Sequence, residues 1–190
     1  MHMLYAVAGR GGCYRVRLML GWLDAPYQIR RIHLLPGMSG QAPGGPDGAV
    51  CLSLADGREV WDRDAMLFAL GEGSALAPRS ADETAEIVTW LRFADVLAAA
   101  SGPEGVAASV MALGRYLQTS RFLVGERYTI ADIAVFAALI GARETCPDER
   151  GSGESGVAES GGGVPEVAAW IDLIRQTQGF VDAGTAMAAA

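Results

Sequence analysis

Cys13 is the side chain in this sequence whose type and neighbours best suit a nucleophile. It stands at the start of a predicted helix, where the helix dipole stabilises an anion. Arg10, Arg15 and Arg17 are close to it along the chain. A helix N-terminus and nearby cations both lower the pKa of a thiol and favour the reactive thiolate. The alternative is that Cys13 is a small buried residue in the first turn of this helix.

The other thiols and imidazoles do not suggest a disulfide framework or a metal centre. The chain has three cysteines, Cys13, Cys51 and Cys146, and their odd number and irregular spacing do not suit paired disulfides. Its two histidines, His2 and His33, are too few for a zinc-type ligand cluster. We therefore expect no bound metal.

The elements that would position Cys13 form a β-α-β pattern. A short apolar segment precedes a Gly-rich break, and a helix and a half-buried strand follow it. After a Pro- and Gly-rich loop, alternating residues predict a hairpin that turns at Asp56-Gly57, and then another helix. In order, these segments are 3–8, 14–23, 27–33, 50–55, 58–61 and 62–70.

After Pro78 the pattern becomes helical throughout. Apolar residues recur at helical spacing in four segments, which are 82–100, 103–119, 130–143 and 165–177. Residues 146–163 are rich in Gly, Ser and Glu, which predicts a loop. We therefore divide the chain into an α/β domain at 1–77 and an all-helical domain at 78–190.

The start of the third of these helices has the strongest local signal. Thr129 is placed to cap the helix, and Asp132 to reach back to the backbone N–H of the cap. Tyr128 and Ile133 are spaced to form a hydrophobic staple across the same turn. This motif predicts a well-formed helix start and concerns folding, not chemistry.

Bulk properties exclude some classes of function. The chain has 190 residues, 51% of them hydrophobic, and a formal net charge of −7. An acidic surface repels phosphate backbones, so we do not expect a nucleic-acid partner. The longest apolar stretch, residues 133–142, is about half the length that a membrane-spanning helix needs. The N-terminus lacks a signal-peptide pattern, so we expect a cytoplasmic protein.

The sequence resembles the glutathione S-transferase superfamily along nearly its whole length. The capped-helix segment is similar to a signature of that family, and other segments agree with the family in order. The matching segments are 13–18, 45–48, 56–67, 122–134, 164–170 and 179–181. The resemblance implies a thioredoxin-like α/β domain followed by a helical-bundle domain. It also implies a cytosolic homodimer that binds glutathione on the first domain and a small apolar electrophile against the second.

At the start of the first helix, the resemblance leaves few candidates for the residue that contacts the glutathione sulfur. The Ser, Asn or Cys that relatives use there falls on Arg10, Gly11 or Gly12. Cys13 is then the nearest polar candidate for a catalytic role. Arg10, Gly12 and Tyr14 are candidates for contacts with the substrate.

Two further segments bear on the glutathione site. Relatives have a cis-proline at the start of the third strand, and here that position falls on Cys51 or Val50, so we expect a trans bond. The same fold would bring Cys13 near Cys51, which suggests a reversible disulfide between them. Asp62 is placed to meet the γ-glutamyl ammonium. Arg63 replaces the Ser that would meet the glutamyl carboxylate.

These departures leave two functions open. The first is glutathione conjugation or glutathione-dependent isomerisation, with Cys13 near the sulfur and Asp62 on the glutamyl amine. The second is a repurposed member of the fold that serves for binding or dimerisation, or that acts on a specialised metabolite without glutathione. Trp90 is a candidate to line the electrophile pocket, although its helical spacing also suits the core.

Overall fold

The structure is a computed structural model that describes residues 1–7, 14–32, 49–100, 102–145 and 163–182. The chain separates into two compact units. We call the first, Met1–Ala77 together with the chain from Gln178, the sheet unit, and the second, Pro78–Thr177, the helical unit. In the described part of the chain, no helix is both long enough and apolar enough to cross a membrane.

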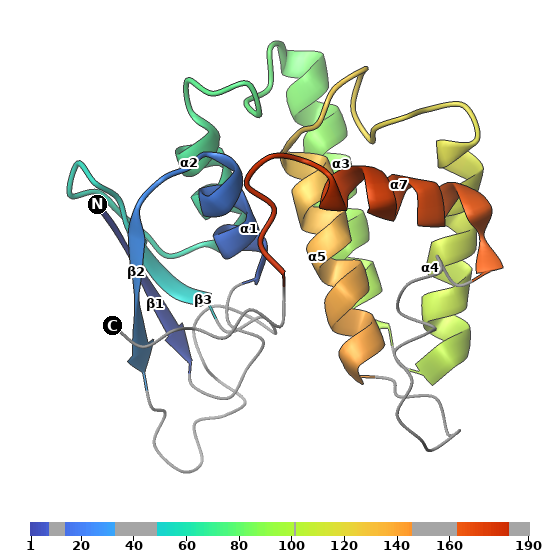
Figure 1. Ribbon diagram of the computed structural model, residues 1–190, viewed down its shortest axis with the longest axis horizontal. Coiled ribbons are helices and arrows are strands. Elements are labelled where there is room, and N and C mark those ends of the chain that lie inside the picture. The colour runs from blue at the N-terminus through green and yellow to red at the C-terminus, as the bar shows by residue number, and fades with distance from the viewer. Residues whose placement is uncertain (8–13, 33–48, 101, 146–162, 183–190) are drawn as a thin grey trace. The chain divides into compact units, whose positions relative to one another are not determined.

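A four-stranded mixed sheet forms one layer of the sheet unit (Figure 1). Its strands are β1 (His2–Val7), β2 (Tyr27–Ile32), β3 (Ala49–Ser53) and β4 (Glu59–Val60), in the order β2-β1-β3-β4. β1 runs parallel to β2, which requires a crossover, and antiparallel to β3, whereas β3 and β4 form a hairpin. Helix α1 (Tyr14–Trp22) provides that crossover.

The hairpin turn forms where Asp56-Gly57 predicts it. Gly57 has a φ of +91°, a conformation that glycine adopts without a steric penalty. Its N–H donates to the carbonyl of Leu54, and the Asp56 carboxylate accepts from the backbone N–H of Arg58 at 2.9 Å. This turn returns the chain as β4 and leads directly into α2 (Arg63–Gly71).

Helices α1 and α2 lie together against one face of the sheet (Figure 1). Their inward side chains are fully buried with those of the strands, as hydrophobic burial requires. This core contains Leu4, Val16, Leu20, Leu52, Met66 and Leu67. The thioredoxin-like arrangement expected from the sequence is therefore confirmed.

The helical unit consists, in its described part, of four helices. They are α3 (Ala81–Ala99), α4 (Gly102–Leu117), α5 (Ile130–Thr145) and α7 (Pro165–Arg175). Helix α5 packs along α3, and α7 packs against α4. Residues 131–139 of α5 are all buried, which makes α5 the central helix of this unit. The predicted loop at 146–163 lies outside the described residues except for Gly163.

Asp132 connects three segments of the helical unit. Its carboxylate accepts hydrogen bonds from the N–H and hydroxyl of Thr129, at 3.0 and 3.2 Å, and from the N–H of Leu123 and the indole of Trp170, both at 3.1 Å. The Thr129 hydroxyl in turn accepts from the N–H of Ala131 at 3.2 Å. The predicted capping box is confirmed, and it also anchors the loop before α5 and helix α7.

The chain from Gln178 groups with the sheet unit, whereas the sequence-based division assigns it to the helical domain. The reason is a close backbone approach. A Cβ on Gly21, near the end of α1, would lie 2.6 Å from the carbonyl oxygen of Gly179 and 2.4 Å from the Val181 side chain. Gly179 itself has a φ of +79°. Glycine at both positions lets residues 178–182 pack on α1.

Candidate functional site

The predicted sulfur-binding end of the site lies only partly within the described structure. Arg10, Gly12 and Cys13 are outside the described residues, so their predicted roles stay predictions. Tyr14 is the first residue of α1, and its side chain is 8% exposed. The helix predicted to follow Cys13 is therefore present, and it begins at the next residue.

Arg15 points away from solvent and has an anionic partner. Its side chain is 3% exposed, and its guanidinium lies 3.1 Å from the Asp64 carboxylate on α2. Arg15 is one of the cations that the sequence predicts to lower the pKa of the Cys13 thiol. Because Asp64 offsets that charge, Arg15 contributes less to such a shift than its sequence position suggests.

The start of β3 holds Val50 and Cys51. Cys51 pairs with Tyr5 of β1, is 3% exposed, and has a free thiol. Burial is the largest influence on this thiol and raises its pKa, and the charge of Glu59 acts in the same direction. Cys51 is therefore a poor nucleophile at neutral pH. Among the described residues no peptide bond is cis.

Asp62 lies at the N-terminus of α2 and caps it. One carboxylate oxygen, Oδ1, accepts from the backbone N–H of Ala65 at 2.8 Å, as a helix N-cap does. The Asp62 side chain is exposed to solvent. The second carboxylate oxygen has no hydrogen-bond partner among the described residues, so an incoming cation has access to it.

Arg63 is the first helical residue of α2. Its Nε lies 3.7 Å from the same Asp64 oxygen that pairs with Arg15, and its side chain is 15% exposed. Asp64 thus holds two guanidinium groups, one from α1 and one from α2. This arrangement links the start of α2 to α1.

Trp90 belongs to the helical unit, where it is part of an aromatic cluster. Its ring makes edge-to-face contacts with Phe93, at 5.4 Å between centroids, and with Tyr116 of α4, at 4.7 Å. Such contacts stabilise the packing of α3 on α4. Trp90 is partly exposed, so its predicted contact with an electrophile stays a prediction.

The structure thus brings together Asp62, Arg63 and, through Asp64, Arg15, all within the sheet unit. Sequence reasoning does not identify Asp64 as the link between the two helices, because 49 residues separate it from Arg15. The signal in the sequence is a pair of arginines, Arg15 and Arg17, on an otherwise largely apolar helix, where a buried cation needs a polar or anionic partner. In the described portion of the chain, no group of His, Cys, Asp and Glu side chains is arranged to hold a metal ion.

Comparison with known proteins finds glutathione S-transferases among the proteins similar to this chain. Residues 94–173 match the family model of the glutathione S-transferase C-terminal domain. A structure of a possible glutathione S-transferase from Rhodopseudomonas palustris is 25% identical, with a TM-score of 0.72 over 97% of this chain and 98% of that one. A glutathione S-transferase from Pseudomonas fluorescens is 22% identical, with a TM-score of 0.71 over 96% and 98% of the two chains.

A curated relative has a different role. The cytoplasmic glutamate–tRNA ligase of Arabidopsis thaliana is 31% identical over 91 residues, which are 46% of this chain. The match spans only 12% of the ligase. The sheet topology, the capped α5, the family match over residues 94–173 and the likeness to solved structures over nearly the whole chain together support a place for this chain in the glutathione S-transferase superfamily.

Proposed function

We propose that the protein binds glutathione on its sheet unit and uses it to conjugate or isomerise a small electrophile. The observation that carries this proposal is the start of α2. There the exposed Asp62 carboxylate uses one oxygen to cap the helix and presents the other to solvent. An ammonium group at that oxygen would form a charge-assisted hydrogen bond.

Each of the remaining site residues has a role in this proposal. Arg63, held by Asp64, would meet the carboxylate of the γ-glutamyl group as a charged donor in place of a serine hydroxyl. The backbone of β3 at Val50 and Cys51 would lie along the tripeptide. Cys13, at the start of α1, would lie near the glutathione sulfur, which must be a thiolate to react. Arg10, Gly12 and Tyr14 would contribute contacts there.

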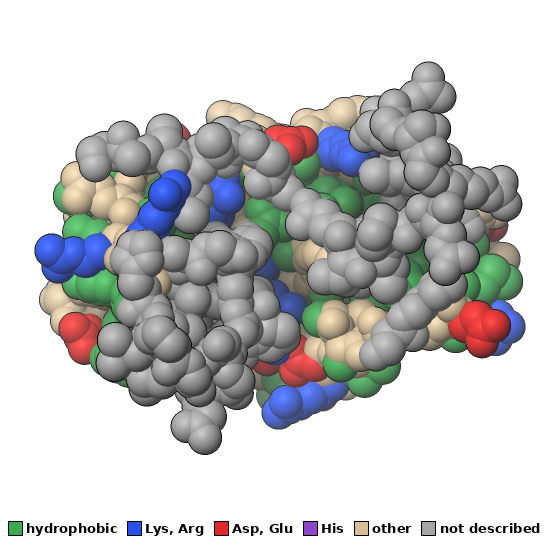
Figure 2. Space-filling model, turned by 90° about the horizontal axis from the view of Figure 1, so that it is seen from below, with side chains coloured by type: hydrophobic (Ala, Val, Ile, Leu, Met, Phe, Trp, Pro, Cys, Tyr) green, Lys and Arg blue, Asp and Glu red, His purple; other side chains and the backbone are tan. Residues whose placement is uncertain are grey.

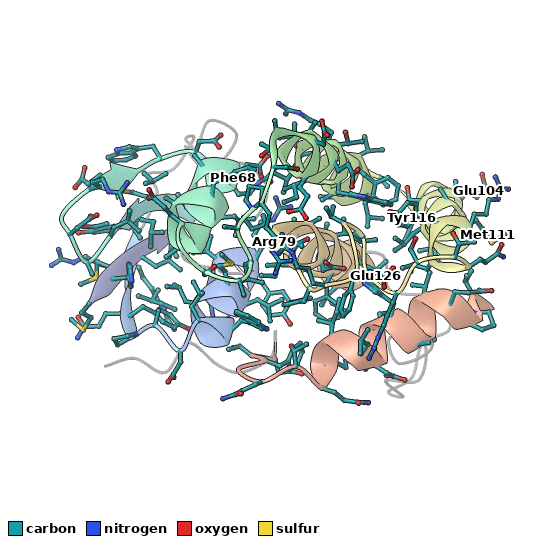
Figure 3. The ribbon with its side chains drawn as sticks, turned by 90° about the horizontal axis from the view of Figure 1, so that it is seen from above. Phe68, Arg79, Glu104, Met111, Tyr116 and Glu126 are labelled. Carbon is teal, nitrogen blue, oxygen red and sulfur yellow. The ribbon has the colours of Figure 1, made fainter. Side chains whose placement is uncertain are left out.

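The helical unit would supply the apolar surface for the electrophile, with Trp90 as a candidate contact. We also propose that two chains form a homodimer in the cytoplasm. Large apolar side chains are exposed on α3 and α4, where Val96 is 63% and Met111 50% exposed, and Val88 lies on α3 as well. Figure 3 shows Met111 and Tyr116 on α4. Burying such side chains favours association.

A second candidate is a repurposed member of the family that binds a partner or dimerises without glutathione chemistry. Two observations favour it. Arg15 is paired with Asp64, which offsets its charge, and Cys51 is a buried thiol with a raised pKa. A related segment also occurs within a much longer tRNA ligase.

Calorimetric titration with glutathione separates the two candidates. The native protein should bind glutathione, and the Cys13→Ala variant should show whether this thiol contributes. No heat of binding at millimolar glutathione would reject the transferase proposal and leave the second candidate. Binding that the variant does not change would reject only the role proposed for Cys13. Sedimentation of the native protein and of Val96→Glu tests the dimer, which the variant should dissociate.

A further inference from the structure

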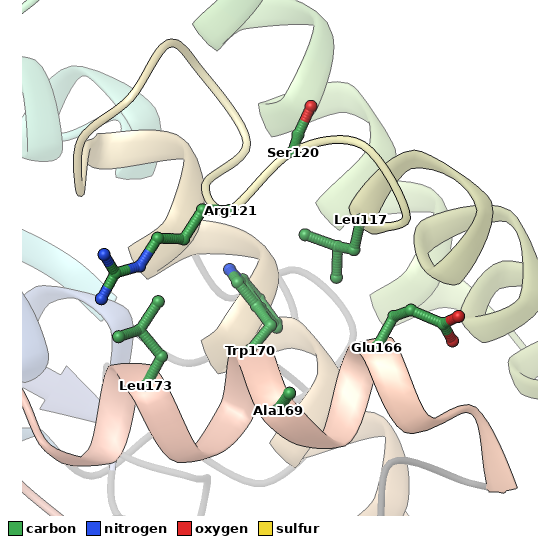
Figure 4. A pocket seen from close by; sticks show the side chains of 7 residues that line it. All are labelled: Leu117, Ser120, Arg121, Glu166, Ala169, Trp170 and Leu173. Carbon is green, nitrogen blue, oxygen red and sulfur yellow. The ribbon is translucent and has the colours of Figure 1, made fainter.

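A pocket in the helical unit lies between α7 and the end of α4 with the segment that follows it (Figure 4). Its volume is about 340 Å³, within the range of small-molecule sites. The residues that line it are Leu117, Ser120, Arg121, Glu166, Ala169, Trp170 and Leu173. All seven belong to the helical unit, and none is a residue of the proposed glutathione site.

The floor of the pocket is apolar and held in place. Trp170 is 2% exposed, its indole N–H donates to Asp132 at 3.1 Å, and its ring contacts Phe136 edge to face. Leu117 is also almost fully buried, and Leu173 lies beside Trp170 along α7 (Figure 4). Because the hydrogen bond fixes the Trp170 ring, this floor does not need to rearrange when a ligand binds.

Two opposite charges flank this floor. In Figure 4 Arg121 and Glu166 stand at opposite ends of the pocket, with Trp170 between them. Neither side chain has an ion-pair partner among the described residues, although the Arg121 guanidinium lies 5.6 Å from the centre of the Phe122 ring. Across its length the pocket therefore presents first a cation, then an apolar surface and then an anion.

We propose that this pocket binds a small zwitterionic peptide of dipeptide size with apolar side chains. Its carboxylate pairs with Arg121, its ammonium pairs with Glu166, and its side chains pack on Ala169 and Leu173, the more exposed apolar residues of the lining. A guanidinium recognises a carboxylate through two parallel hydrogen bonds, which gives this end its selectivity. A ligand with only one charged end leaves one of the two flanking charges without a partner.

The probe is the dipeptide leucyl-phenylalanine, with its C-terminal amide and its N-acetyl derivative as matched ligands. Binding is followed by NMR chemical-shift changes in the labelled native protein. We expect saturable binding in the millimolar range, with shifts at Trp170 and its neighbours. Each end-blocked ligand should bind about tenfold more weakly, because one charge pair is lost.

Two variants and two control variants test which end of the dipeptide pairs with Arg121 and which with Glu166. Arg121→Gln should weaken binding of the free dipeptide by about tenfold. It should also remove the difference in affinity between the dipeptide and its C-terminal amide. Glu166→Gln should also weaken binding of the free dipeptide by about tenfold, and it should remove the difference between the dipeptide and its N-acetyl derivative. Arg115→Gln and Asp172→Asn remove matching charges outside the pocket, on α4 and α7, and should bind as the native protein does.

Three results would overturn the proposal. They are a lack of saturable binding in the millimolar range, equal binding of the free and end-blocked peptides, and binding that Arg121→Gln and Glu166→Gln leave unchanged. Because all four substituted residues lie at the surface or rim of the unit, the variants should keep the native melting temperature. A melting curve for each variant checks this directly.

Discussion

Two aspartates at helix starts, Asp132 in the helical unit and Asp62 in the sheet unit, show how one residue type serves two purposes. Asp132 is fully buried and accepts four hydrogen bonds from three segments of the chain. Asp62 is exposed and accepts one, from the first turn of its own helix. The first carboxylate is occupied in holding the fold together, whereas the second has an oxygen available to a ligand.

The surroundings of the two carboxylates produce this difference. Asp132 sits among apolar side chains of α5 and α7, where a charge persists only if every lone pair has a donor. Asp62 follows a short hairpin at the surface and needs only one bond to satisfy its helix. Stability should therefore depend on Asp132, and binding on Asp62. Among the described residues visible in Figure 2, acidic and basic side chains are scattered and do not form a single charged surface.

Replacing Asp132 should have the largest effect on stability. Asp132→Ala leaves the donors of Leu123, Thr129 and Trp170 buried without their acceptor. The free energy of unfolding in urea should fall by about 3 kcal/mol or more. Asp172→Asn, an exposed change on α7, should stay within about 0.5 kcal/mol of the native value. A loss below about 1 kcal/mol for Asp132→Ala would contradict the role given to this carboxylate.

Asp132 should also make stability depend on pH. Burial raises its pKa to about 6, against the opposing effect of its hydrogen bonds. Because the unfolded value is 3.8, the folded chain binds a proton more tightly than the unfolded chain between these limits. The contribution of Asp132 to the free energy of unfolding should therefore fall as pH rises from about 4 to about 6, by at most about 1.4 kcal/mol per pH unit.

Comparing native protein and Asp132→Asn isolates this contribution, since the other carboxylates titrate in both. The difference between their free energies of unfolding should change with pH in that window and become constant above it. A difference that is constant from pH 4 to pH 7 would show that Asp132 keeps an ordinary pKa in the folded chain.

Asp64 is intermediate in exposure between the buried Asp132 and the exposed Asp62, and substitution of its partner Arg15 tests its contribution to stability. Arg15→Met removes the buried guanidinium and leaves the carboxylate, 22% exposed, without its partner on α1. The free energy of unfolding should fall by about 1–2 kcal/mol, less than for Asp132→Ala, because water and Arg63 still solvate Asp64. Urea unfolding checks this value. A loss as large as that of Asp132→Ala would show that the Arg15–Asp64 pair stabilises the fold as strongly as the hydrogen bonds of Asp132 do.

The cap on α2 should have the smallest effect on stability. Asp62→Ala removes the acceptor for the N–H of Ala65 and should cost about 1 kcal/mol. Asp62→Asn keeps a good capping oxygen and should be close to neutral. Thermal unfolding of both variants checks this order. If both variants lost equal stability, the carboxylate charge and not the cap would be the stabilising feature.

Local sequence signals predicted the fold because they agree with one another. The Thr129–Asp132 capping box, the Asp56-Gly57 turn and the helix stops depend on neighbouring residues, and all three appear in the structure. The domain boundary before Pro78 is likewise indicated by a change of pattern among neighbouring residues. The sequence does not indicate that the chain from Gln178 groups with the sheet unit, because its contact with Gly21 joins residues far apart in sequence.

The candidate site was less predictable for the same reason. Asp62 follows from its place after the hairpin, but the pairing of Arg15 with Asp64 depends on how α1 and α2 pack. The burial of Cys51, which raises its pKa, likewise depends on the sheet and the helices that cover it. Residue type and spacing therefore identified the available chemistry, and tertiary packing determined which groups are accessible.

Glutathione binding by Asp62→Asn tests the central claim most directly, because this variant removes a charge and keeps the helix cap. Calorimetry should show binding by the native protein, binding about tenfold weaker by Asp62→Asn, and native-like binding by Asp82→Asn, which removes a charge from the first turn of α3. The melting temperatures of all three should agree. Equal affinity of Asp62→Asn and native protein, or no binding by the native protein at millimolar glutathione, would contradict the account.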